Sequence, residues 1–132
     1  MRQQFDLTKT LEELESVAWD ESNYDSHLVQ TCHNLRRKPV GRFSIEDLRI
    51  MIGQNIGVQF LVPIAIEKLQ TDPLSEGDFY PGDLLAVVLR IEPIFWKQEP
   101  GWKTELKKIL DRLGPIPKEL ADAVRIFREG AV

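Results

Sequence analysis

Residues 58–69 read VQFLVPIAIEKL, and this stretch decides the fold because it is apolar on nearly every side. A helix without a polar face belongs in the middle of a bundle, where other helices cover it. Pro63 is compatible with such a helix if it lies in the first turn, where its missing N–H has no partner to lose. The stretch therefore predicts a buried central helix.

A second segment, LLAVVLRI at residues 84–91, is equally apolar. Periodicity alone also allows a buried strand here. However, the chain offers no second stretch with alternating apolar and polar residues, and a single strand cannot satisfy its own backbone hydrogen bonds. We therefore expect a second buried helix.

Apolar residues at helical spacing predict shorter helices around these two. Their stripes are Leu7/Leu11/Leu14/Ala18, Leu28/Cys32/Leu35, Ile45/Leu48/Ile52/Ile56, Leu106/Ile109/Leu110/Leu113 and Leu120/Val124/Phe127. Capping residues mark their starts: Thr10 with Glu13 (or Thr8), Ser26, Ser44 with Asp47, and Pro117 at a first helical position. The tryptophans at 19, 96 and 102 are expected in the core. The predicted fold is all-α: a single compact domain over residues 1–132, with about seven short helices around two fully apolar central helices.

The length of 132 residues is typical of one domain, and 42% hydrophobic residues are enough for a core. Cys32 is the single cysteine, so no disulfide forms within the chain, and a lone thiol fits a reducing compartment. The longest apolar run, residues 60–66, is far shorter than the roughly 20 residues of a membrane helix. We expect a cytoplasmic protein without membrane contact.

The net charge of −4 is unevenly distributed. Residues 1–25 carry −5, residues 26–69 carry +3, residues 70–83 carry −4, and the remainder carries +2. Both acidic segments also contain aromatic residues, a combination that suits contact with a basic protein partner. Two solvated faces are the alternative interpretation. Nucleic-acid binding is disfavoured, because such proteins usually carry a basic excess.

Catalytic motifs are weak. His27, Cys32 and His33 lie close in sequence, but helical spacing places them on diverging faces, and the chain has no other cysteine or histidine to complete a zinc site. We expect Cys32 in the core beside two partly exposed histidines. No glycine-rich phosphate loop is present. The residues therefore predict no catalytic site, no metal and no cofactor.

Several longer strings resemble a known family. They are LTKTLEELE (7–15), YDSHLVQTCHNLRRKP (24–39), FSIEDLRIMIGQNIG (43–57), FLVPIAIEKLQTDPLSEGDFYPGDLLAVVLR (60–90) and FW (95–96). In this order they resemble the contact-dependent growth inhibition (CDI) immunity proteins of bacteria. The resemblance covers most of residues 7–96 and is weaker over the last two helices.

The resemblance implies a small cytoplasmic inhibitor, not an enzyme, that binds the C-terminal toxin domain of a cognate secreted effector and protects the producing cell. Many such toxins are nucleases, whose basic clefts suit an acidic inhibitor. We expect a monomer that contacts the toxin but neither nucleic acid nor membrane. The candidate toxin-binding residues are Glu12, Glu13, Glu15, Asp20, Glu21, Tyr24, Asp72, Glu76, Asp78 and Tyr80.

Two alternatives stay open. One is a helical regulator or adaptor that binds through residues 44–69, although Arg42 and Arg49 are few for a DNA backbone. The other is an enzyme that uses Cys32 with His27 or His33.

Overall fold

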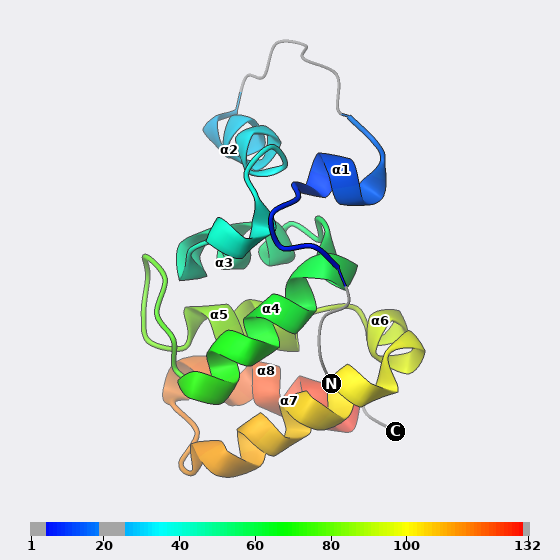
Figure 1. The fold of residues 1–132 in the computed structure, drawn as a ribbon. Coiled ribbons are helices and arrows are strands. Elements are labelled where there is room, and N and C mark those ends of the chain that lie inside the picture. The colour runs from blue at the N-terminus through cyan, green and yellow to red at the C-terminus, as the bar shows by residue number, and fades with distance from the viewer. Residues whose placement is uncertain (1–4, 19–25, 131–132) are drawn as a thin grey trace.

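Helices account for the regular structure of the chain (Figure 1). The computed structural model describes residues 5–18 and 26–130. Within these ranges the elements are α1 (Leu11–Glu15), α2 (His27–Leu35), the 3₁₀ turn η1 (Val40–Arg42), α3 (Ile45–Gly53), α4 (Val58–Thr71), α5 (Asp83–Leu89), α6 (Pro93–Gln98), α7 (Pro100–Leu113), the 3₁₀ turn η2 (Lys118–Leu120) and α8 (Ala121–Glu129). The described residues contain no strand, so the all-α prediction is confirmed, with eight α-helices where about seven were expected.

The middle of α4 is enclosed by other helices. Residues 61–66 are buried in six consecutive positions, so every side of this helix segment is covered. Helices α3, α5 and α7 pack against it, and α8 packs against α5 (Figure 1). Helix α5 is buried at every position except the half-buried Val87. These two helices contribute a large share of the buried core.

Pro63 lies sixth in α4, and so not in the first turn, where a helix accommodates a proline without losing a hydrogen bond. A proline at this position cannot donate to the carbonyl four residues earlier, which belongs to Gln59. Gln59 is exposed, so solvent can hydrate that carbonyl. The helix thus continues through Pro63, which is itself buried, without that hydrogen bond.

Helix α1 is much shorter than its apolar stripe suggested. The capping box of Thr10 and Glu13 is confirmed, but Ser16 adopts a left-handed conformation and ends the helix after five residues. Before the helix, the carbonyl of Leu7 accepts from the N–H of Gly41 at 2.9 Å. The chain at Leu7 thus bonds to the η1 turn, and helical periodicity overestimated the helix in both directions.

Local capping signals located the other starts more accurately. Ser26 caps α2, and Ser44 forms a capping box with Asp47 at the start of α3. Two expectations were wrong: α3 ends at Gly53 and does not continue to Ile56, and Pro117 precedes η2, so that α8 begins only at Ala121. Trp96 and Trp102 lie in the core as predicted, whereas Trp19 falls outside the described residues.

Gly57 lies where Leu11 of α1 packs closely against the start of α4. Its φ is +63°, and a Cβ there would lie 2.8 Å from both terminal methyl carbons of Leu11. We expect Gly57→Ala to destabilise the fold by more than the roughly 1–2 kcal/mol of left-handed strain alone, because a buried leucine must also move. Urea unfolding measures the change.

Gly53→Ala is the matched control. A Cβ at this position meets its nearest side-chain atom, in Val87, at 3.4 Å, and the φ of Gly53 is not positive. We expect this variant to be neutral or slightly stabilising, since alanine favours helix more than glycine does. Equal losses from the two variants would contradict the packing of α1 on α4.

Candidate functional site

The connection between α4 and α5, residues 72–82, forms a folded loop. Glu76 and Pro81 pair as an isolated antiparallel bridge. Gly82 has a φ of +94° and donates its N–H to the carbonyl of Leu74 at 3.1 Å. These contacts close residues 77–80 into a tight tip at one side of the molecule, between α4 and α5 in Figure 1.

Asp83, the first residue of α5, lies beneath this tip and forms hydrogen bonds with its backbone. Its side chain is 2% exposed, and its carboxylate accepts from the N–H groups of Gly77 at 2.6 Å and Phe79 at 3.0 Å. The guanidinium of Arg49 lies 3.9 Å away. A buried carboxylate is tolerated when hydrogen bonds and an opposite charge compensate its lost hydration, and both are present here.

Glu46 and Arg49 of α3 support the tip from the other side. Arg49 donates from Nε to Glu46 Oε1 at 2.6 Å, and the same oxygen accepts the N–H of Asp78 at 2.9 Å. The hydrogen bond from Arg49 is the main reason that the pKa of Glu46 lies below its ordinary value. The guanidinium also lies 4.3 Å from the centre of the Phe79 ring, a cation–π contact.

This support presents an aromatic side chain to solvent. Phe79 is 68% exposed, although it is large and apolar, and the neighbouring Glu76 and Asp78 are exposed as well. An aromatic group flanked by carboxylates on a fixed turn is suited to binding a partner, because little conformational freedom is lost on contact. We call residues 76–80 the acidic tip.

The acidic tip contains three of the predicted site residues. Glu76 and Asp78 are exposed, and Tyr80 is half-buried against the core. Asp72, also exposed, lies at the base of the loop, where it accepts the N–H of Leu74 at 3.0 Å.

The N-terminal candidates are arranged differently. Glu12 pairs with Arg37 at 3.0 Å, and Glu15 pairs with Arg36 at 2.7 Å. Glu13 accepts the N–H of Thr10 in the capping box. Arginines therefore partly compensate the charges of Glu12 and Glu15, whereas Glu13 is exposed. Asp20, Glu21 and Tyr24 lie outside the described residues.

The structure does not merge the two acidic segments into one patch. Helix α1 contacts Gly57 at the start of α4, whereas the loop that carries the tip begins at the end of the same helix. Fourteen residues of helix separate these points by about 20 Å.

Sequence reasoning missed the support of the tip: Glu46, Arg49 and Asp83 were not among the candidates, and neither was Phe79. The spacing of Glu46 and Arg49 does indicate an ion pair within a helix. Their contact with a loop about 30 residues later in the chain has no local signal.

Cys32 and His33 do not form an accessible nucleophilic pair. Both side chains are buried, so the expectation that both histidines are partly exposed holds only for His27. Burial raises the pKa of the Cys32 thiol, which disfavours the thiolate.

A search of the described ranges found no group of three or more His, Cys, Asp or Glu side chains arranged to hold a metal ion. No helix in residues 5–18 or 26–130 combines the length and hydrophobicity that crossing a membrane requires.

Removing the charge of Asp83 tests the support of the tip. We expect Asp83→Asn to lower the free energy of unfolding by about 1.5–3 kcal/mol, because buried N–H donors lose a charged acceptor. Amide hydrogen exchange at Gly77 and Phe79 should also accelerate. Asp78→Asn, a neighbouring exposed carboxylate, should stay within about 0.5 kcal/mol of the parent. Unchanged exchange in Asp83→Asn would contradict the assignment.

The lowered pKa of Glu46 predicts a pH-dependent contribution. Since the folded pKa lies below the ordinary value of 4.5, the charged side chain stabilises the fold above that pH, and the stabilisation is lost as the pH falls through the folded pKa. The stability difference between the parent and Glu46→Gln should be constant above about pH 6 and shrink in acid. Urea unfolding across this range measures it, and a difference that grows in acid would refute the prediction.

Comparison with known proteins agrees with the resemblance seen in the sequence. The family model of the CDI immunity proteins matches residues 13–106, which include the acidic tip and its supporting side chains. The chain matches no curated protein and no solved structure. Since the family model covers well over half of the sequence, the chain belongs to the CDI immunity protein family.

Proposed function

We propose that this immunity protein binds the C-terminal toxin domain of a cognate CDI effector in the cytoplasm of the producing cell and neutralises it. We further propose that the toxin is a nuclease. The family assignment supports the first statement. The second rests on charge, because an acidic, aromatic contact surface suits a cleft that binds nucleic acid.

The observation that carries the proposal is the acidic tip. Its two carboxylates, Glu76 and Asp78, are exposed, whereas Glu12 and Glu15 are held in ion pairs with arginines. Exposed charge accelerates the association of oppositely charged partners. The tip also supplies Phe79, an aromatic side chain of the kind that is enriched at protein interfaces.

The first experiment asks whether the function is right. The full chain should co-purify with the C-terminal fragment of the large secreted protein encoded beside it, and its expression should restore growth to cells that produce the fragment. If the fragment degrades nucleic acid, adding the chain should stop the degradation. Failure of both co-purification and rescue would overturn the proposed function.

The second experiment asks whether the tip makes the contact. We expect Glu76→Lys with Asp78→Lys to slow toxin association about tenfold or more at low salt, and to flatten its salt dependence, because electrostatic steering is lost. Stopped-flow or surface-binding kinetics measure the rate. Phe79→Ala should instead raise the dissociation rate.

Glu92→Lys is the control for a single charge reversal, and its effect is compared with that of Glu76→Lys alone, because the double variant reverses twice as much charge. Glu92 is also exposed, and it precedes α6, which lies on the side of the molecule opposite the tip in Figure 1. Association unaffected by the tip variants, or slowed equally by Glu92→Lys, would show that the interface lies elsewhere.

The enzyme alternative makes a different prediction. Replacing the buried thiol in Cys32→Ser costs some packing but leaves an inhibitor able to protect cells, whereas an enzyme that depends on Cys32 loses its function.

A further inference from the structure

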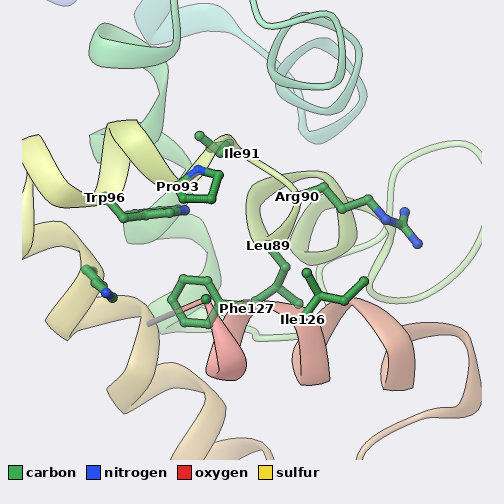
Figure 2. Close-up of a pocket in the computed structure, with 9 residues that line it drawn as sticks. Leu89, Arg90, Ile91, Pro93, Trp96, Ile126 and Phe127 are labelled. Carbon is green, nitrogen blue, oxygen red and sulfur yellow. The ribbon is translucent and has the colours of Figure 1, made fainter. Parts of the chain in front are cut away.

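A pocket lies between the α5–α6 turn and α8, away from the acidic tip (Figure 2). Its volume is about 160 Å³. Apolar side chains form most of its wall, and they come from Leu89, Ile91, Pro93, Trp96, Ile126 and Phe127. An engineered apolar cavity of roughly 150 Å³ accommodates benzene, so the interior of this pocket has room for a single ring.

The aromatic part of the wall is held in place by its own packing. Trp96 is buried, and Phe127 packs against it edge-on at a centroid distance of 5.6 Å. Phe95 makes a second edge contact with Trp96 at 4.9 Å. A wall that is already ordered loses little conformational freedom when a ligand enters, which favours binding.

The other side chains of the lining are basic. Arg90 and Lys103 both line the pocket, and none of the described residues that line it is acidic. Arg90 is exposed, and its side chain forms no hydrogen bond or ion pair with the rest of the described chain. In Figure 2 its guanidinium is directed away from Trp96 and Phe127. The positive charge therefore lies at the outer side of the pocket, not among the apolar side chains.

The position of this charge identifies the kind of occupant. A carboxylate buried among apolar side chains loses its hydration at a large cost. At the outer side of the pocket it keeps contact with water and meets a planar guanidinium, whose donors match the two oxygens of a carboxylate. An apolar interior beside an exposed arginine thus suits a molecule with an apolar body and an acid group at one end.

Negative groups of the protein leave Arg90 available for this contact. Glu92 and Glu129 lie close to the lining in the chain but do not belong to it, and Glu129 pairs with Arg125 at 3.3 Å. Gly130 follows the C-terminal end of α8, where backbone carbonyls carry a partial negative charge. An acid group is therefore favoured beside Arg90 and disfavoured beside Gly130.

We propose that this pocket binds a small aromatic carboxylate, whose ring occupies the apolar interior and whose acid group pairs with Arg90. The site is separate from the acidic tip, so it is tested without the toxin. It uses α8, which lies beyond the stretch matched by the family model.

Benzoate and benzamide test the proposal, because they have nearly the same shape and differ in charge at neutral pH. We expect both to bind the full chain saturably, followed by the methyl NMR signals of Leu89. Nuclear Overhauser contacts from the ring protons to the methyl groups of Leu89 and Ile126 should place the ring. Benzoate should bind about three- to fivefold more tightly than benzamide at low salt, and added salt should reduce this difference.

Arg90→Gln removes the charge and keeps much of the side-chain length. In this variant the affinity for benzoate should fall to about that for benzamide, whereas the affinity for benzamide should not change. Arg128→Gln is the matched control, because Arg128 is also an exposed arginine but does not line this pocket. It should leave the preference for benzoate in place.

Four outcomes would overturn the proposal. The first is the absence of saturable binding of benzoate to the parent chain. The second is equal affinity of the parent chain for the two probes. The third is a preference for benzoate that persists in Arg90→Gln and is lost in Lys103→Gln, which would place the acid group elsewhere. The fourth is a shift of the Leu89 signals with protein concentration in the absence of a probe, which would show that a second copy of the chain fills the pocket.

Discussion

The fold depends on one constraint, that the middle of α4 and nearly all of α5 are buried on every side. Because these two segments need apolar neighbours on every side, the remaining helices pack around them. The connection between the two helices must still reach water, because a buried loop leaves backbone groups without partners. The 72–82 loop therefore lies at the surface. It ends at Asp83, which is the first residue of the buried helix α5.

Asp83 links the core to the candidate site. A carboxylate at the start of a buried helix gains from the helix dipole, but it is expensive without hydrogen bonds. The loop supplies these through its own N–H groups, and Arg49 supplies the opposite charge. The same bonds that make Asp83 tolerable fix the shape of the acidic tip. The rigidity of the exposed tip is thus a consequence of burying the residue below it.

The sequence predicted what local chemistry determines. Two apolar stretches identified α4 and α5, and the capping boxes at Thr10 and Ser44 are confirmed. Periodicity failed at α1, because a left-handed serine ends the helix early and the chain before it, at Leu7, bonds to a distant turn. Charge counting failed in a similar way. It treated Glu12 and Glu15 as free acids, whereas arginines more than 20 residues later pair with them.

The acidic tip separates residues that maintain the fold from residues available to a partner. Glu46, Arg49 and Asp83 are mostly buried, and Arg49 pairs with both carboxylates, so replacing Arg49 leaves two negative charges without their opposite charge. Glu76, Asp78 and Phe79 are exposed, and substitutions at exposed positions usually change stability little. Specificity for one toxin over a related one requires contacts that can change, including unfavourable ones. The acidic tip meets this requirement, because its exposed side chains can be exchanged while Glu46, Arg49 and Asp83 keep its backbone in the same conformation.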